Sequence, residues 1–171
     1  MSTVALFVDG SNMFYAQKQQ GWNIDWESVL KHFTAGKETC GAYYFTARPA
    51  AGNAKAVEGY RKFRTALIYL GYNVIDKEIH IIQDPSTGAI VKVKGNLDIE
   101  LVFRMLTSAH GWDDGILMGV DLDYIPIINH LRNLGKTITC VGRRQMTSIE
   151  LINAAKFLDL DGLRKLIEKK K

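Results

Sequence analysis

The sequence predicts an α/β protein with a mostly parallel central sheet. Short apolar runs alternate with amphipathic helical segments along the 171 residues, which is the order of successive βαβ units. The first run, residues 4–8, ends at Asp9, Gly10 and Ser11, and these turn formers mark the carboxyl end of a buried strand. We detect no repeat, linker or low-complexity segment, so we expect one domain.

The composition is that of an ordinary globular protein. Hydrophobic residues make up 47% and charged residues 23%, and the net charge of +4 permits a nucleic-acid partner without requiring one. No apolar run approaches the ~20 residues of a membrane span, and no secretory signal is evident, so we expect a cytoplasmic protein with no membrane partner. Cys40 and Cys140 fall in strand-like runs and are expected to be free thiols.

The first half of the chain begins with predicted helices over residues 13–20 and 26–33, the second capped by Asp25. A strand is expected over residues 39–46. Helical spacing of apolar residues then predicts a helix over residues 54–70, which ends at Gly71. Residues 73–82 and 89–93 are rich in β formers and flank the turn sequence 84–88, so we expect a β-hairpin inserted into the βαβ order.

The second half repeats the alternation. A helix is predicted from Asp98 to about Ser108, a strand over residues 115–120, and a helix with Pro126 in its first turn that ends before Gly135. Residues 137–141 are the last clear strand. Ser148 is expected to cap a helix that continues to about residue 157, and residues 161–171 are expected to form a short helix with a basic tail.

Four aspartates stand where strands end or helices begin. Asp9, Asp121 and Asp123 follow apolar strands, and Asp98 begins a helix. Carboxyl ends of parallel strands share one edge, so neighbouring strands would bring these carboxylates together, and a hard cation such as Mg²⁺ or Mn²⁺ would compensate their charge. Separate helix caps are the other interpretation. Capping does not require the second acid Asp123, and Lys94 places a cation where a phosphate would bind.

Three motifs occur in order: Phe7-Val8-Asp9-Gly10-Ser11-Asn12, Lys94-Gly95-Asn96-Leu97-Asp98 and Val120-Asp121-Leu122-Asp123-Tyr124. Together they resemble the NYN domain, and within it the LabA-like bacterial branch of the PIN-like nuclease superfamily. The resemblance implies a three-layer α/β/α domain over residues 1–160. It also implies a ribonuclease that uses Mg²⁺ or Mn²⁺, with Asp9, Asp98, Asp121 and Asp123 as the metal-binding acids and Asn12 beside the first acid.

The chain departs from the usual family pattern at several positions. Val120 and Leu122 flank Asp121 where relatives often carry glycine and serine, and Arg104 stands where many carry a further acid. These departures leave the four aspartates intact, and they bear on substrate and rate more than on metal binding.

The expected substrate is RNA, in single-stranded form. Ser11 and Lys94 are candidate substrate contacts, and Arg143 and Arg144 follow a strand at the same sheet edge, although an arginine pair in a loop is as often simply solvated. Tyr15 is among the aromatic residues that could stack a base. Homo-oligomer formation stays open.

A second class of function competes with the enzyme. The chain could be a catalytically idle module that binds metal, RNA or a protein partner in regulation, and the intact set of four aspartates favours the enzyme. A phosphatase of the haloacid-dehalogenase type is disfavoured because Ser11 stands where that chemistry needs an acid. The turn after the first strand lacks the glycine pattern of dinucleotide-binding proteins.

Overall fold

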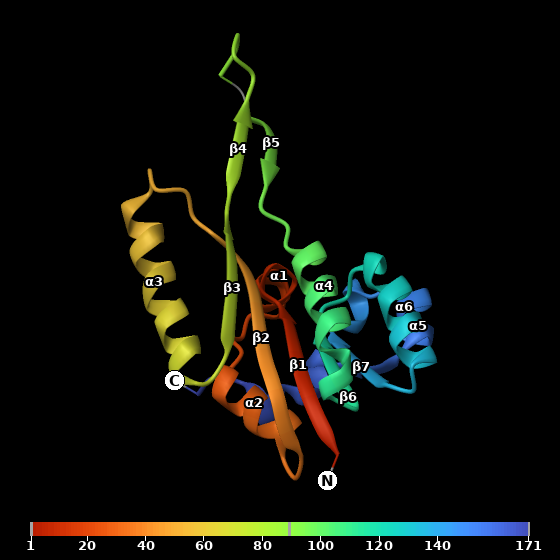
Figure 1. Cartoon of the computed structure of the whole chain (residues 1–171). Coiled ribbons are helices and arrows are strands. Elements are labelled where there is room, and N and C mark those ends of the chain that lie inside the picture. Colours follow the sequence, from red (N-terminus) through yellow and green to blue (C-terminus); the bar gives the residue numbers. More distant parts are fainter. Residues whose placement is uncertain (1, 89, 171) are drawn as a thin grey trace.

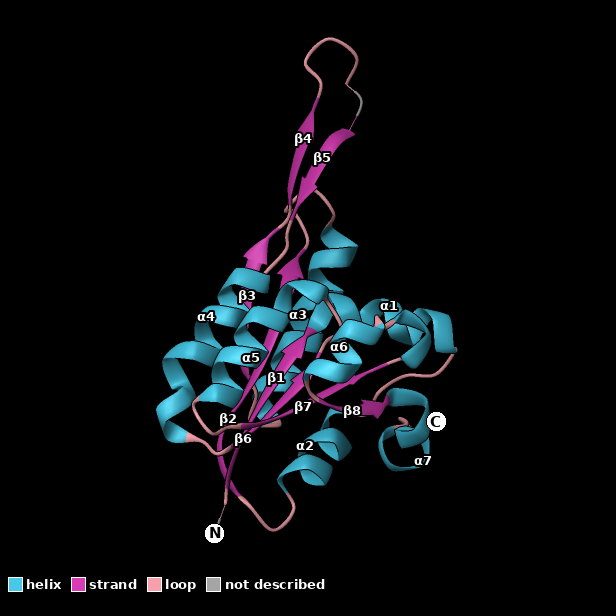
Figure 2. Ribbon diagram, turned by 90° about the vertical axis from the view of Figure 1, so that its right-hand side faces the viewer, coloured by secondary structure: helices cyan, strands magenta, loops and turns pink. Residues whose placement is uncertain are grey.

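A six-stranded sheet, parallel throughout, forms the centre of the protein in a computed structural model that describes residues 2–88 and 90–170. The strand order is β3-β2-β1-β6-β7-β8. In chain order the strands are β1 (Thr3–Asp9), β2 (Glu38–Arg48), β3 (Asn73–Glu78), β6 (Asp114–Met118), β7 (Thr137–Gly142) and β8 (Lys156–Asp159). Helices lie on both faces of this sheet (Figures 1 and 2), which confirms the predicted α/β/α class.

Alternate residues of β1 face two separate hydrophobic clusters. Val4, Leu6 and Val8 pack with the helices α1 (Gly10–Gln20), α2 (Trp26–Thr34) and α3 (Ala54–Tyr69) on one face. Ala5 and Phe7 pack with α4 (Asp98–Ser108), α5 (Ile125–Asn133) and α6 (Ile149–Ala154) on the other. Because both faces are covered, β1 is buried from Val4 to Asp9, as its continuous apolar run predicts.

Local capping chemistry sets the helix starts. The side chains of Asp25 and Ser148 accept hydrogen bonds from the first-turn amides of α2 and α6, as predicted, and Asn53 does the same for α3. Gly21, with φ of 74°, ends α1 in the left-handed region that glycine adopts most easily. The predicted helices are therefore present, with ends that shift by a few residues.

The β-rich segment after α3 divides into two parts. Asn73–Glu78 joins the main sheet as β3, while β4 (His80–Gln83) and β5 (Ile90–Lys94) form an antiparallel hairpin. Figures 1 and 2 show this hairpin projecting beyond the rest of the molecule. At its turn, the carboxylate of Asp84 accepts hydrogen bonds from the amides of Ser86 and Thr87. The inserted hairpin that the sequence predicts is confirmed.

The C-terminal region differs from the prediction in two respects. The helix capped by Ser148 ends at Ala154 and not near residue 157, and residues 156–159 form an additional parallel strand beside β7. A four-residue edge strand is too short to carry a readable period. Beyond it, α7 (Arg164–Ile167) is short, and Ile167 is fully buried. The backbone of Glu168 forms an isolated antiparallel β-bridge with that of Ile24, so this segment packs into the main core. Within the described residues, no helix is long and apolar enough to cross a membrane.

The strand order reverses direction at one place. From β1 the chain adds β2 and then β3 on one side, and it returns to place β6 on the other side of β1. In open parallel sheets, this switch point leaves a crevice beyond the carboxyl ends of the two central strands. Because Val8 of β1 is in register with Met118 of β6, Asp9 and Asp121 emerge beside this crevice.

Candidate active site

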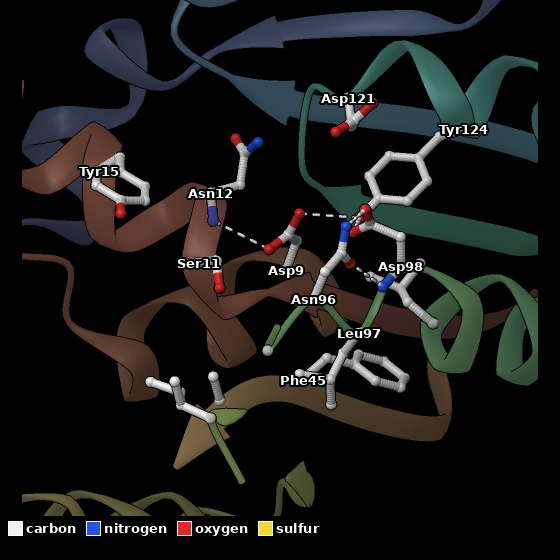
Figure 3. Close-up of a pocket in the computed structure, with 14 residues that line it drawn as sticks. Asp9, Ser11, Asn12, Tyr15, Phe45, Asn96, Leu97, Asp98, Asp121 and Tyr124 are labelled. Carbon is white, nitrogen blue, oxygen red and sulfur yellow. Dashed lines mark hydrogen bonds between the residues drawn. The ribbon is translucent and has the colours of Figure 1, made fainter. Parts of the chain in front are cut away.

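A pocket of about 390 Å³ opens at the switch point between β1 and β6. Its walls come from β1 and α1, the end of β2, the base of the hairpin, the start of α4 and the segment after β6. The lining residues are Asp9, Ser11, Asn12, Tyr15, Phe45, Ala47, Ile79, Gly95, Asn96, Leu97, Asp98, Leu101, Asp121 and Tyr124 (Figure 3). Three of the four predicted acids therefore share one pocket.

Asp9 is a buried carboxylate with a capping role. It is 9% exposed, and its Oδ1 accepts a hydrogen bond from the backbone N–H of Asn12 at 3.0 Å. The next residue must be small, because a Cβ on Gly10 would lie 2.5 Å from the backbone oxygen of Phe45. A Cβ on Gly119 would likewise lie 3.2 Å from the Cβ of Asp9. These glycines let β2 and the segment after β6 approach the first acid closely.

The hydroxyl of Tyr124 joins two of the acids. It lies 2.8 Å from Oδ2 of Asp9 and 2.7 Å from Oδ1 of Asp98, and the tyrosine side chain is fully buried (Figure 3). A hydroxyl carries one proton and donates to one carboxylate at a time. The second contact is a hydrogen bond only when that carboxyl group is protonated. No local pattern in the sequence marks Tyr124 for this connecting role, because its two partners are far away in the chain.

Burial is the main cause that raises the pKa of Asp9 above its ordinary value. The negative charges of Asp98 and Asp121 raise it further, while hydrogen bonds from the Asn12 amide and the Tyr124 hydroxyl lower it. Burial also raises the pKa of the Tyr124 phenol, and the two neighbouring carboxylates add to this effect. The phenol is therefore a hydrogen-bond donor at neutral pH. The pocket thus places the poorly solvated carboxylate of Asp9 beside the charges of Asp98 and Asp121.

Two asparagines place polar atoms around the acids. Asn96 accepts from the backbone N–H of Asp98 at 2.7 Å, and its side-chain amide donates to the carboxylate of Asp98. Asn96 lies within the motif Lys94-Gly95-Asn96-Leu97-Asp98, but its residue type alone does not indicate this contact with Asp98. The side-chain oxygen of Asn12 is buried and has no hydrogen-bond partner among the described residues. An unpaired buried carbonyl oxygen is an acceptor available to a ligand.

Asp121 and Asp123 differ in their position relative to the pocket. Asp121 lines the pocket, and its Oδ1 accepts from the backbone N–H of Asp123 at 2.9 Å. Asp123 itself is exposed, and it does not belong to the pocket lining. Both Asp9 and Asp121 therefore cap a helical turn while also facing the pocket. Asp98 lines the pocket but does not cap α4, so the capping interpretation holds for two of the three pocket acids.

The predicted substrate contacts are distributed unevenly. Ser11 lines the pocket, whereas the pocket lining includes neither Arg143 nor Arg144. The Arg143 side chain is only 11% exposed, and its guanidinium donates to Asp161 at 3.3 Å. Arg144 is exposed to solvent. The side chain of Lys94 lies outside the described residues.

The donor chemistry of the pocket fits a hard divalent cation. Its carboxylates, together with the unpaired Asn12 oxygen, are the ligand type that Mg²⁺ and Mn²⁺ prefer. Within residues 2–88 and 90–170, however, no group of three or more histidine, cysteine or acidic side chains is arranged so that it could hold a metal ion. Two of the acids instead engage the Tyr124 hydroxyl.

Comparison with known proteins extends over the whole fold. The sequence model of the NYN domain matches residues 3–161. The chain is 37% identical over 171 residues to the low amplitude and bright protein LabA of Synechococcus elongatus, covering 98% of this chain and 89% of that protein. It also superimposes on a crystal structure of a protein of unknown function from Vibrio parahaemolyticus with a TM-score of 0.77, 24% identity, and coverage of 97% and 96% of the two chains. The match to the domain and the identity to LabA confirm the resemblance seen in the motifs, and the chain belongs to the NYN domain family.

Proposed function

We propose that this protein is a ribonuclease dependent on Mg²⁺ or Mn²⁺, and that it hydrolyses phosphodiester bonds of RNA in the pocket at the carboxyl edge of the sheet. The observation that carries the proposal is the convergence of Asp9, Asp98 and Asp121, which come from distant parts of the chain, at the switch point of a parallel sheet. Membership of the NYN domain family, which lies within the PIN-like nucleases that the motifs resemble, supports the same reaction class.

The three pocket aspartates would hold the cation once Asp9 and Asp98 turn from the Tyr124 hydroxyl toward it, with Asp123 adding a carboxylate from the exposed side of the same turn. When bound, the ion would neutralise charge on the scissile phosphate and lower the pKa of the attacking water. The unpaired oxygen of Asn12 would accept a hydrogen bond from that water and orient it. No side-chain nucleophile is required.

Substrate binding would use groups around this centre. The hydroxyl of Ser11 lines the pocket and would donate to a phosphate oxygen. Lys94 and the exposed Arg144 would contribute positive charge along the backbone of the bound strand. Arg143 would act indirectly, because Asp161 already binds its guanidinium and it would hold the loop that presents Arg144.

A second candidate function rests on the contacts of Tyr124. Its hydroxyl lies within hydrogen-bond distance of both Asp9 and Asp98 without any ion, so these two acids already share a protein partner. A module that binds RNA without cleaving it would retain the same fold and the same pocket. The two functions differ in whether a cation is bound and in whether the strand is broken.

The test is cleavage of a labelled single-stranded RNA by the purified protein with Mn²⁺, with EDTA, and in three variants. We expect cleavage with Mn²⁺ and none with EDTA. Asp121→Asn should lose about 100-fold or more in rate, since even groups that only support a metal ligand typically contribute about 10- to 100-fold. Asp123→Asn should lose less, because that side chain lies outside the pocket lining.

The matched control is Asp113→Asn, at the opposite end of β6, where the carboxylate binds Thr3. It should cleave at the wild-type rate. Cleavage that survives EDTA, or Asp121→Asn as active as the wild type, would refute the proposed reaction. RNA binding without any cleavage, together with no heat of Mn²⁺ binding in calorimetry, would select the non-catalytic module.

A further inference from the structure

One wall of the pocket carries an aromatic ring that is open to solvent. Three aromatic side chains belong to the described lining, and two of them are enclosed: Phe45 is 2% exposed and Tyr124 is fully buried. Tyr15 is 60% exposed. Figure 3 shows it on α1, on the same side of the pocket as Asn12 and away from Asp98. Because Tyr15 follows Ser11 by one helical turn, both side chains lie on the same face of α1.

A second exposed ring lies beside Tyr15, and a cation lies over that second ring. Phe14 is 50% exposed, and its ring centroid lies 5.6 Å from that of Tyr15 at an interplanar angle of 73°. The Nζ of Lys18 lies 4.4 Å from the centroid of the Phe14 ring. Neither aromatic residue belongs to either hydrophobic cluster of the core, where α1 contributes Met13 and Ala16. Core packing therefore does not account for either ring.

We infer that Tyr15 is a stacking platform for a nucleobase of the RNA strand whose phosphate lies at the pocket aspartates. Grooves that bind single strands combine exposed aromatic rings with nearby positive charge, which is the combination of Tyr15, Phe14 and Lys18. Bases in a duplex are stacked on each other and are not free to pack on a side chain. The platform thus selects single-stranded RNA, and this inference rests on the function proposed above.

The test uses tryptophan as a reporter of stacking. The native tryptophans are all buried, with Trp22 at 5%, Trp26 at 7% and Trp112 at 1% exposure, so a Tyr15→Trp variant carries one accessible indole. The probes are a labelled oligouridine strand, an abasic ribose-phosphate strand of the same length, and a duplex. All are used in EDTA, so that no strand is cleaved. Tyr69→Trp is the matched control, because Tyr69 is 88% exposed on α3 and lies outside this pocket lining.

We expect oligouridine to quench the fluorescence of the Tyr15→Trp variant, and the abasic strand and the duplex to leave it unchanged. Tyr69→Trp should show no quenching that depends on bases. Fluorescence anisotropy should show that Tyr15→Ala weakens oligouridine binding by about 5- to 150-fold, the range for loss of one stacked base, while its affinity for the abasic strand is unchanged. Tyr15→Phe, which retains a ring, should bind oligouridine like the wild type.

Failure of this inference can be distinguished from failure of the proposed function. If Tyr15→Ala binds and cleaves oligouridine like the wild type, or if the abasic strand quenches equally, the platform is refuted and the nuclease proposal stands. If the wild type neither binds any strand nor cleaves RNA with Mn²⁺, the proposed function fails, and the stacking platform fails with it.

Discussion

Replacing Tyr124 by phenylalanine removes one hydroxyl group and preserves the shape of a fully buried ring. The hydroxyl lies between Oδ2 of Asp9 and Oδ1 of Asp98, so the change deletes the hydrogen-bond donor that connects two pocket acids. Asp9 retains the backbone N–H of Asn12 on its other oxygen. Because Asp9 is only 9% exposed, water replaces the lost donor poorly. We therefore expect Tyr124→Phe to be less stable than the wild type.

The magnitude follows from the type of hydrogen bond lost. Hydrogen bonds to charged groups typically contribute about 1.5–3 kcal/mol to the free energy of unfolding, and the buried ring adds no cavity term because its volume hardly changes. For a chain of this length, about 2–4 °C in melting temperature corresponds to each kcal/mol, so we expect a loss of about 3–12 °C. Tyr69→Phe, at an 88% exposed position, should change stability by less than about 0.5 kcal/mol.

The pH dependence has a definite sign. Burial raises the pKa of Asp9 above the ordinary aspartate value of 3.8, so the folded state binds a proton more tightly than the unfolded state. Stability from this group is therefore fully present below pH 3.8, and it is lost as the pH rises through the folded pKa. The Tyr124 hydrogen bond lowers that pKa, so its removal raises the pKa further and extends the loss to higher pH. The deficit of Tyr124→Phe should thus grow from acidic to neutral pH.

Urea unfolding followed by circular dichroism, in EDTA at about pH 4.5 and about pH 7.5, measures both effects. Equal stability of Tyr124→Phe and wild type near neutral pH would show that the hydroxyl is not a donor to the acids. If the stability deficit of Tyr124→Phe has the same size at both pH values, the Tyr124 hydrogen bond does not lower the pKa of Asp9.

Three further predictions concern other parts of the chain. A thiol reagent should modify the exposed Cys40 quickly in the native protein and Cys140 only after unfolding. The reason is that burial raises the pKa of the Cys140 thiol to about 12. Rapid modification of both thiols in the native protein would contradict this prediction. Arg143→Ala should cost about 1 kcal/mol of stability because it breaks the contact with Asp161. Arg144→Ala should leave stability unchanged and reduce by about one the slope of the logarithm of RNA affinity against the logarithm of salt concentration. A stability loss in Arg144→Ala, together with a reduced slope in Arg143→Ala, would refute the roles given to the two arginines. Gly10→Ala should destabilise the protein by about 1–3 kcal/mol in urea unfolding, since its Cβ would lie 2.5 Å from a backbone oxygen of β2, and a wild-type midpoint would contradict this close approach.

Local chemistry made much of the fold predictable. The caps at Asp25 and Ser148 were predicted correctly because a cap depends on a side chain and on amides within the next three residues. The buried strand β1 was predicted because an unbroken apolar run requires cover on both faces. The strand β8 was missed because its four residues, one exposed and three half-buried, carry no clear period. Its pairing with β7 is what makes it a strand.

The candidate site was predicted in part for the same reason. The sequence marked Asp9, Asp98 and Asp121 as acids at strand or helix ends, and the structure brings these three to one pocket. The exposed position of Asp123 and the role of Asn96 were not predicted. Both depend on how a short turn presents each side chain, and the residue type does not specify that orientation.

The sequence by itself determined the alternation of strands and helices, the acids at their ends and the family to which the chain belongs, because each of these is written in neighbouring residues. Only the tertiary structure decided that β1 and β6 are neighbours, that the Tyr124 hydroxyl connects Asp9 to Asp98, and that Asp161 holds the side chain of Arg143. These contacts join residues far apart in the chain. Their partners are selected by the packing of both hydrophobic clusters at once, and no local pattern carries that information.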